Sequence, residues 1–348
     1  KIMNKSEFTQ LSLVAGGNAF LAKNHLFQSS HEPLPLFYNL LDTNNKVTLT
    51  ADNLFNQTAV LAILLVDNGH IVYEKYKKPV TEKMPLFAWS MSKSLVAFTL
   101  GYLIREKIIE SVDDLVQKYT SKLSNTVFAE ATIRNLLTMS SGVSPSLDHG
   151  NQQADEWLLM KNQQLSLLEH LHISGVKHTT PGLQFNYSGT DTEAICHIID
   201  ENVGFLKYFD KNIWQPSRCE HNSYWMLEKD NKAIAQAGFS ATARDYVRIA
   251  LHLIRELNDK NDFLTQATTP QISIGKKNAN FRSYGFQIWT ENHYSKNSFW
   301  LSGMNGQRIG IDADKEKIIK TSVSQSVATG TIDKLKIYAE KAGCSVGD

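Results

Sequence analysis

The sequence has little cysteine and almost no net charge. The cysteines are too few for a disulfide framework, show no C-x-x-C spacing and, being odd in number, leave at least one unpaired: Cys196, Cys219 and Cys344. The cysteines therefore do not distinguish an oxidising from a reducing compartment. With 36 Lys and Arg against 35 Asp and Glu, the formal charge is +1. No overall field draws the chain to phosphate backbones or anionic lipid, so we expect neither nucleic acid nor a membrane surface as a partner.

Long hydrophobic runs are missing as well. The longest, Ala59–Val66 and Leu95–Ile104, fall short of the roughly 18 to 20 residues that span a bilayer, so no transmembrane segment is predicted. The opening residues, Lys1–Glu7, have no methionine in first place and no apolar signal-peptide core. Either a leader was removed or the chain was trimmed. Removal of a leader favours a periplasmic or secreted location over a cytoplasmic one.

Several common catalytic signatures are also absent. The sequence has no H-E-x-x-H, no Walker loop, no G-x-S-x-G elbow and no dinucleotide-binding G-x-G-x-x-G. These absences exclude zincins, P-loop enzymes and ordinary α/β-hydrolases. His170 and His172 stand close together, yet no third ligand has a suitable spacing. We interpret them as a solvated helix end and expect no metal site.

The chain does contain enough apolar material for a large core. Its 348 residues are 42% hydrophobic and 20% charged, which predicts one large or two intertwined globular domains. The order of predicted elements is two strands, helices, strands and a final helix. This order predicts an α/β fold whose central antiparallel sheet takes strands from both ends of the chain. We expect a discontinuous α/β domain from residues 1–105 and 236–348, and a mostly helical domain from 106–235.

Hydrophobic periodicity places the individual elements. Strands at 58–66 and 71–76 flank Asn68-Gly69, a pair that favours a two-residue hairpin turn. Residues 92–105 are apolar nearly all round, which predicts a helix buried on most sides. The other predicted elements are a helix start at Ser111–Asp114, helices at 132–139, 242–257 and 332–342, and strands at 284–290, 299–303, 308–311 and 317–323.

One short pattern suggests a nucleophile. In S-x-x-K, a serine at the start of a helix lies one turn from a lysine, so the hydroxyl and the amine meet on one face. The spacing occurs three times: Ser90 with Lys93, Ser174 with Lys177, and Ser273 with Lys276. The second and third pairs enclose a glycine and precede no apolar helix. We interpret both as loops with exposed lysines.

Ser90 and Lys93 instead open the most apolar helix of the chain. Burial and the positive end of a helix both favour the neutral form of a lysine, which can act as a base. The alternative is a serine N-cap with Lys93 reaching out to solvent. The motif alone leaves both interpretations open.

Two other segments are candidates for the same site. Tyr187 lies between a Pro-Gly turn and a helix opened by Thr190-x-x-Glu193, where a tyrosine can point into a cleft. Its alternative is a core aromatic with a satisfied hydroxyl. In Ser302–Gln307, small residues at a strand end would let backbone N–H groups approach a substrate oxygen. The alternative there is a plain turn.

Together and in this order, the three segments resemble one superfamily of serine hydrolases. The chain resembles the class C β-lactamase, DD-peptidase and serine esterase group, with 6-aminohexanoate-dimer hydrolase as its nearest-looking branch. Residues 62–76 look like the family's opening hairpin, Thr132–Gly142 like its post-nucleophile helix and Gly238–Arg248 like its Ala-Thr-Ala-Arg-Asp helix. The resemblance covers about residues 50–340. It implies a β-lactamase/DD-peptidase-like fold.

The resemblance implies a role for each matching residue. Ser90 would be the nucleophile, Lys93 its proton acceptor, and Tyr187 the group that passes a proton to the departing half. The backbone N–H groups of Ser90 and Met304 would form the oxyanion hole, and no metal or cofactor is required. The reaction would proceed through an acyl-Ser90 intermediate. Three further residues are expected at the substrate pocket: Trp89, Gly303 and Asn305.

Two departures from the family pattern bear on the substrate. The second motif is often Tyr-x-Asn, but Gly189 stands in its third place, and Leu301 stands where the third motif often has Lys or His. An amide for a lactam or peptide carbonyl and a cation for a penicillin carboxylate are missing at those places. We therefore predict an amidase or esterase for a small-molecule substrate. The alternatives are a β-lactamase, a DD-peptidase, or a penicillin-binding sensor that acylates without turnover. The sequence leaves the oligomeric state unknown.

Overall fold

The computed structural model describes residues 23–57, 60–143, 164–275, 281–292, 298–315 and 317–323. The predicted helix at 332–342 lies outside these residues, as do Lys276 and Cys344. Cys196 and Cys219 are buried free thiols. Within the described ranges, no helix combines the length and the apolar character needed to cross a membrane.

The main sheet begins with the hairpin that the sequence predicts. β2 (Val60–Asp67) pairs antiparallel with β3 (His70–Tyr76), and Asn68 and Gly69 join them with φ angles of 50° and 73°. A two-residue turn between twisted strands requires positive φ angles at both positions. Gly69 adopts such an angle without steric cost. The Asn-Gly pair therefore determines where the chain reverses.

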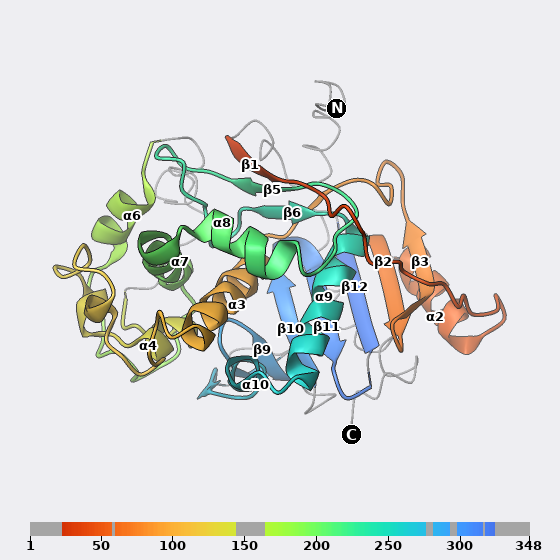
Figure 1. The fold of residues 1–348 in the computed structure, drawn as a ribbon. Coiled ribbons are helices and arrows are strands. Elements are labelled where there is room, and N and C mark those ends of the chain that lie inside the picture. Colours follow the sequence, from red (N-terminus) through yellow and green to blue (C-terminus); the bar gives the residue numbers. More distant parts are fainter. Residues whose placement is uncertain are drawn as a thin grey trace.

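The hairpin belongs to an eight-stranded sheet in the described part of the chain. The order is β3-β2-β12-β11-β10-β9-β8-β7, and each pairing is antiparallel. The sheet thus joins strands from both ends of the chain, as predicted (Figure 1). The later strands are β7 (Ile272–Ser273), β8 (Phe281–Tyr284), β9 (Trp289–Asn292), β10 (Ser298–Gly303), β11 (Gln307–Asp312) and β12 (Lys317–Val323).

The predicted strand at 284–290 is wrong. These residues form the end of β8, a tight turn and the start of β9, and the Gly285 N–H donates to the Ile288 carbonyl at 2.8 Å. A Cβ on Gly285 would lie 2.0 Å from the Ala267 carbonyl oxygen, so the backbone passes close to its neighbour. Phe286 and Ile288 are fully buried. An apolar run that looks like a strand is therefore a buried corner.

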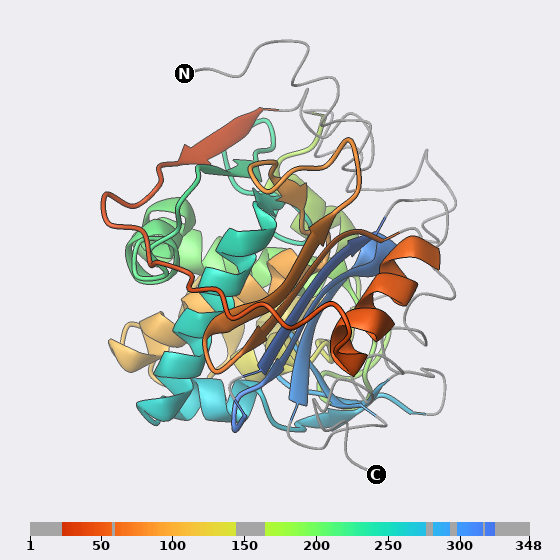
Figure 2. The same cartoon turned by 90° about the vertical axis from the view of Figure 1, so that its right-hand side faces the viewer.

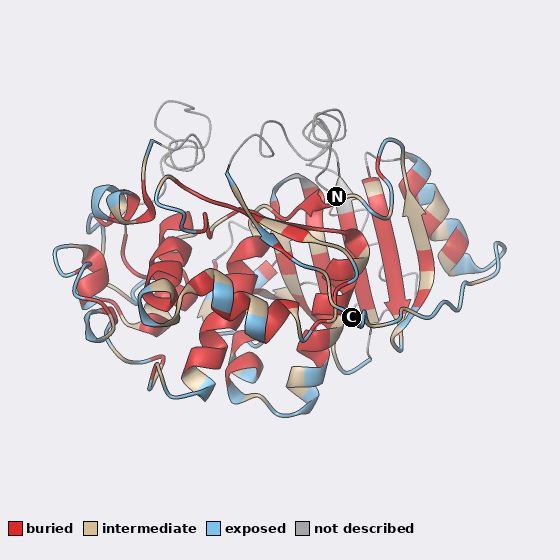
Figure 3. Cartoon of the chain, turned by 45° about the horizontal axis from the view of Figure 1, so that its top comes forward, coloured by how far each residue is buried: buried red, intermediate tan, exposed pale blue. Residues whose placement is uncertain are grey.

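Helices cover both faces of the main sheet. α2 (Lys46–Gln57) packs on β2 and β3 from one side, and α9 (Ala243–Asn258) packs on β2, β11 and β12 from the other (Figure 2). The buried apolar residues divide accordingly into a small cluster that includes Phe55 and a large one that includes Ile309. Figure 3 shows the sheet buried, with exposed residues along the outer side of α2. This layering confirms the predicted central sheet flanked by helices.

A second sheet, of four strands, lies beside the helices. Trp225 of this sheet packs edge to face against Phe205 and Phe209, with ring centroids 4.9 and 5.2 Å apart. The strand at one edge of this sheet, Leu86–Phe87, ends shortly before Ser90. The sheet therefore anchors the chain just before it enters the following helix. The antiparallel strands, in spatial order, are β1 (Asn24–Phe27), β5 (Ser223–Met226), β6 (Phe239–Ala241) and β4 (Leu86–Phe87).

Most of the other helices lie between β4 and β5 in the sequence. The helix predicted at 132–139 is shorter and begins with a Thr132/Asn135 capping box. The helix start at Ser111–Asp114 is wrong, because the Asp114 carboxylate accepts the Ser111 N–H and closes a turn. The predicted boundaries between the α/β domain and the mostly helical domain, at residues 105/106 and 235/236, stay a prediction. The helices are α4 (Ile133–Leu137), α6 (Leu167–Ser174), α7 (Gly189–Val203) and α8 (Phe205–Phe209), one-turn helices at Val116–Lys118, Val127–Glu130 and Asp210–Trp214, and, after α9, α10 (Asp262–Ala267).

A buried carboxylate ties α9 to the loop before β5. Asp245 accepts the backbone N–H groups of Glu220 at 2.7 Å and His221 at 3.1 Å, and it pairs with Arg248 at 2.9 Å. Burial alone would raise the pKa of Asp245, but hydrogen bonds from His221 and Glu220 and the Arg248 charge hold it below its ordinary value.

We expect Asp245→Ala to lower the free energy of unfolding by about 3 to 5 kcal/mol. The Glu220 and His221 N–H groups would lose their acceptor, and buried Arg248 would keep only the 40% exposed Glu220 as an anionic partner. Urea unfolding at pH 7 measures the loss. Because the folded pKa is depressed, the contribution is present at neutral pH and is lost as the pH falls below about 4.

Asp113→Ala is the matched control. Asp113 pairs with Arg134 at 2.6 Å, but its side chain is 64% exposed, and exposed pairs contribute at most about 1 kcal/mol. Equal losses in the two variants would contradict the structural role of Asp245.

Candidate active site

The nucleophile candidate stands at the start of a helix that is buried nearly all round. α3 (Met91–Arg105) has Ser90 as its N-cap, and every residue from Met91 to Leu103 is buried. The helix agrees with the prediction for residues 92–105. Because α3 is buried along most of its length, a lysine in its first turn is largely shielded from solvent.

Trp89 sets the direction in which the helix begins. Its φ angle is 51°, in the left-handed region that costs a non-glycine residue about 1 to 3 kcal/mol. The Ala88 N–H donates to the Phe239 carbonyl at 2.8 Å, and the Trp89 ring packs edge-on against Phe87 with centroids 4.9 Å apart. These contacts hold the strained turn, which presents Ser90 at the open end of α3.

Lys93 turns inward to Ser90 rather than outward to solvent. Its ammonium donates to Ser90 Oγ at 2.9 Å and to the Gln236 carbonyl oxygen at 2.8 Å, and the residue is 3% exposed. Burial lowers the pKa of Lys93 to about 7, and the negative charge of Glu193 opposes this shift. A substantial neutral fraction therefore exists near neutral pH.

Tyr187 comes to the same serine from the loop before α7. Its hydroxyl is hydrogen-bonded to Ser90, and its ring centre lies 5.3 Å from Lys93 Nζ. Burial raises the pKa of Tyr187 to about 12, although the hydrogen bond and the positive charge of Arg308 act against this rise. The ring also stacks on Trp289 at 5.4 Å. Tyr187 is thus both part of an aromatic cluster and a neighbour of Ser90.

The third segment reaches the site at the end of β10. A Cβ on Gly303 would lie 2.2 Å from the Ala88 carbonyl oxygen and 3.2 Å from Trp89 Cβ, so only glycine permits this approach. It brings the backbone of Met304, which begins the one-turn helix Met304–Gly306, close to the chain before Ser90. Met304 is 48% exposed. The side chain of Asn305 lies outside what the structure describes.

Sequence reasoning missed Arg308, which follows this segment on β11. Its guanidinium donates to the carbonyl oxygens of Gly303 and Gln307 and thereby ties the two ends of the turn together. Its charge also acts on Tyr187. No motif pointed to Arg308, because its contacts depend on the pairing of β10 with β11.

Glu193 does not cap the start of a helix, which its place in Thr190-x-x-Glu193 predicted. α7 is capped by Ser188, whose hydroxyl accepts the Thr190 N–H at 3.2 Å, so the predicted Thr190-x-x-Glu193 start is wrong. The fully buried Glu193 carboxylate instead accepts the N–H groups of Ala235 at 3.1 Å and Gln236 at 2.9 Å. Burial raises its pKa to about 7, against the effect of these hydrogen bonds and of Lys93.

Neither of the other S-x-x-K serines, both of which are described, stands at the head of a buried helix. Ser174 is the last residue of α6, not part of a loop, and Lys177 pairs with Glu130 on the surface. Ser273 lies in β7. His170 is buried, not solvated as predicted, and burial lowers its pKa to about 4. Among the described residues, no cluster of three or more His, Cys, Asp or Glu side chains is placed to hold a metal.

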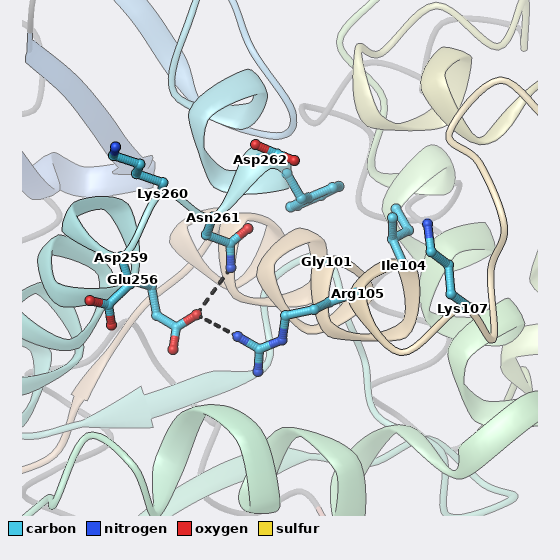
Figure 4. Close-up of a pocket in the computed structure, with 10 residues that line it drawn as sticks. Gly101, Ile104, Arg105, Lys107, Glu256, Asp259, Lys260, Asn261 and Asp262 are labelled. Atoms are coloured by element: carbon cyan, nitrogen blue, oxygen red, sulfur yellow. Dashed lines mark hydrogen bonds and ion pairs between the residues drawn. The ribbon is translucent and has the colours of Figure 1, made fainter.

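A hollow of about 380 Å³ lies at the opposite end of α3 (Figure 4). Two of its charged groups pair, because Glu256 accepts from Arg105 at 2.9 Å, and Glu256 also accepts from the Asn261 amide at 3.0 Å. On its floor, a Cβ on Gly101 would meet the Phe263 ring at 2.4 Å, so α3 and α10 pack at minimum distance. This hollow is separate from the surroundings of Ser90.

An antiparallel sheet covered by helices on both faces, with Ser90 at the head of a buried helix, defines the β-lactamase and penicillin-binding-protein class of fold. A sequence profile of the family described as Beta-lactamase matches residues 51–338. The chain belongs to the β-lactamase family, and it is a hydrolase of that fold. A search of curated protein sequences finds no match.

Solved structures show the same fold at low sequence identity. A Bacillus anthracis protein assigned as a 6-aminohexanoate-dimer hydrolase superposes with a TM-score of 0.78 at 20% identity, covering 92% of each chain. The hydrolase EstCE1, described with promiscuous acyltransferase activity, has a TM-score of 0.68 at 12% identity and covers 85% of this chain and 97% of its own. A D-stereospecific amidohydrolase from Streptomyces sp. has a TM-score of 0.64 at 15% identity, with the same coverage.

Burial of Lys93 predicts a cost in stability. Below pH 7 the amine is protonated in both the folded and the unfolded chain, so the cost of the depressed pKa is fully present there. As the pH rises from 7 towards the unfolded value near 10.4, that cost disappears. We expect Lys93→Met to raise the free energy of unfolding by about 1 to 2 kcal/mol at pH 6, with a gain that shrinks towards pH 9.5.

Thermal unfolding of the two proteins from pH 6 to 9.5 measures this difference. A Lys93→Met variant that is less stable than wild type at pH 6, or a gain independent of pH, would contradict the inferred desolvation of Lys93.

Proposed function

We propose that this protein is a serine hydrolase that cleaves a small amide or ester through an acyl-Ser90 intermediate. The observation that carries the proposal is the 2.9 Å contact between Lys93 Nζ and Ser90 Oγ, made by a buried lysine whose pKa is lowered to about 7. A neutral amine at that distance is a competent acceptor for the serine proton. The same contact in an exposed pair would leave the lysine fully protonated.

In acylation, Ser90 Oγ attacks the substrate carbonyl carbon while Lys93 takes its proton. The negative charge that develops on the carbonyl oxygen faces two backbone N–H groups, that of Ser90 at the start of α3 and that of Met304 after β10. The dipole of α3 adds positive potential there. Tyr187 is protonated at rest because burial raises its pKa to about 12. It gives this proton to the departing amine or alcohol and is reprotonated by Lys93, which returns the proton taken from Ser90. Water then attacks the acyl-serine, with Tyr187 and Lys93 assisting its deprotonation.

The substrate proposal rests on the third motif. Leu301 is 1% exposed and belongs to the main core, so β10 offers no cation at this position to a penicillin carboxylate. The Arg308 guanidinium on the next strand is engaged with the carbonyls of Gly303 and Gln307. The names of the amide-hydrolysing structural neighbours support the same choice.

The first test is the identity of the nucleophile. A fluorophosphonate should label wild-type protein at one site, and Ser90→Ala should abolish both labelling and turnover while leaving the unfolding temperature nearly unchanged. Intact-mass spectrometry and peptide mapping measure the labelling. Ser174→Ala, which alters another S-x-x-K serine, should label like wild type. Persistent labelling of Ser90→Ala would overturn the assignment.

The second test is substrate class. We expect p-nitrophenyl butyrate and small linear amides to be hydrolysed with a higher kcat/KM than nitrocefin or penicillins. A neutral polar group buried without a partner costs roughly 1 to 3 kcal/mol and a carboxylate more, so the penalty reaches about a hundredfold in rate. Ser90→Ala provides the background rate. Efficient lactam hydrolysis with inert esters and amides would show a β-lactamase, and stable acylation by penicillin without turnover would show a sensor.

A further inference from the structure

The place left empty by Gly189 is filled by another side chain. A Cβ on Gly189 would lie 1.9 Å from Gln236 Oε1 and 2.6 Å from its Cδ. The Gln236 amide therefore occupies the space in which a side chain at position 189 would begin. Gly189 is two residues beyond Tyr187, so this amide lies next to the second motif although it comes from the segment between β5 and β6.

The backbone of Gln236 is fixed within the site. Its carbonyl oxygen accepts from Lys93 at 2.8 Å, and its N–H donates to Glu193 at 2.9 Å. Glu193 also accepts the preceding N–H, from Ala235. With both peptide groups held by buried partners, only the side chain of Gln236 is free to change direction.

The side-chain amide itself is available to a ligand. It makes no hydrogen bond within the described residues, and the residue is half-buried rather than enclosed. A primary amide offers one acceptor and two donors, the complement of a peptide-like C=O or N–H group. An alkyl chain would leave these groups without partners.

We propose that Gln236 is a substrate-contacting residue, which supplies from the neighbouring segment the amide that the second motif lacks and so favours substrates with an amide group beside the scissile bond. The proposal rests on the proposed function, because it needs a substrate acylating Ser90. Gly189 is the permissive partner, since any larger residue there would displace the Gln236 side chain.

Matched substrates test the proposal. p-Nitrophenyl N-acetylglycinate and p-nitrophenyl pentanoate share a leaving group and a similar length but differ by an amide in the acyl part. Glycolamide butyrate and butyl butyrate place the same difference on the leaving side. For at least one pair, Gln236→Ala should lower the ratio of the two kcat/KM values about fivefold to tenfold, the effect of one hydrogen bond.

Two variants at position 189 make the test independent of a general loss of activity. Gly189→Ala should reproduce the fall in the ratio, because its Cβ displaces the Gln236 amide. The double variant Gly189→Asn with Gln236→Ala should restore the ratio at least in part, since it returns an amide from the other side. Gln215→Ala removes another half-buried glutamine, whose amide donates to the Gln28 carbonyl and to Asp210, and should leave the ratio unchanged.

The outcomes separate the two proposals. An unchanged ratio in Gln236→Ala for both pairs, or an equal loss on both members of each pair, would overturn the role of Gln236 while leaving the serine hydrolase intact. A wild-type protein that neither labels at Ser90 nor hydrolyses any of the four esters would instead overturn the proposed function.

Discussion

The burial of one amine governs the arrangement of this site. Lys93 lies in the first turn of a buried helix and is only 3% exposed, and its ammonium has two acceptors, Ser90 Oγ and the Gln236 carbonyl. A charged lysine is costly in such surroundings, so the protein must either compensate the charge or lower the proton affinity. It does both in part, because Glu193 contributes a negative charge while desolvation lowers the pKa to about 7. The catalytic proposal depends on this partial compensation.

Several distant segments must meet for that balance to exist. The Gln236 carbonyl is 143 residues from Lys93 in the sequence, and it is held in place by Glu193 from α7. α7 is in turn fixed to the sheet side, where the Thr192 hydroxyl donates to Gln287 Oε1 at 2.8 Å and the Gln287 carbonyl accepts from Ser94 of α3 at 2.6 Å. Both helices of the site are therefore hydrogen-bonded to the same residue, Gln287, in the buried corner between β8 and β9.

Local signals explain which parts the sequence could predict. An Asn-Gly turn, an apolar helix and an S-x-x-K spacing each act over a few residues, so they predict the hairpin, α3 and Ser90 with Lys93 as a candidate pair. The spacing leaves open whether Lys93 turns inward, because packing around the helix decides it. Glu193 resembled a helix cap because the same residue types serve both purposes. Its true partners at 235 and 236 are set by packing between α7 and a distant loop. Phe286 and Ile288 were mistaken for strand residues for a similar reason, since a buried corner and a buried strand are equally apolar.

The close contact between Gly101 of α3 and Phe263 of α10 constrains how this protein can evolve. The helix that presents Ser90 is also the centre of the hydrophobic core, and at Gly101 it touches α10 with no space for an added methyl group. Selection on the core and selection on turnover therefore act on the same rigid body. A lineage that altered this packing would tilt Ser90, the proposed nucleophile, at the other end, so activity could drift through substitutions that never approach a substrate.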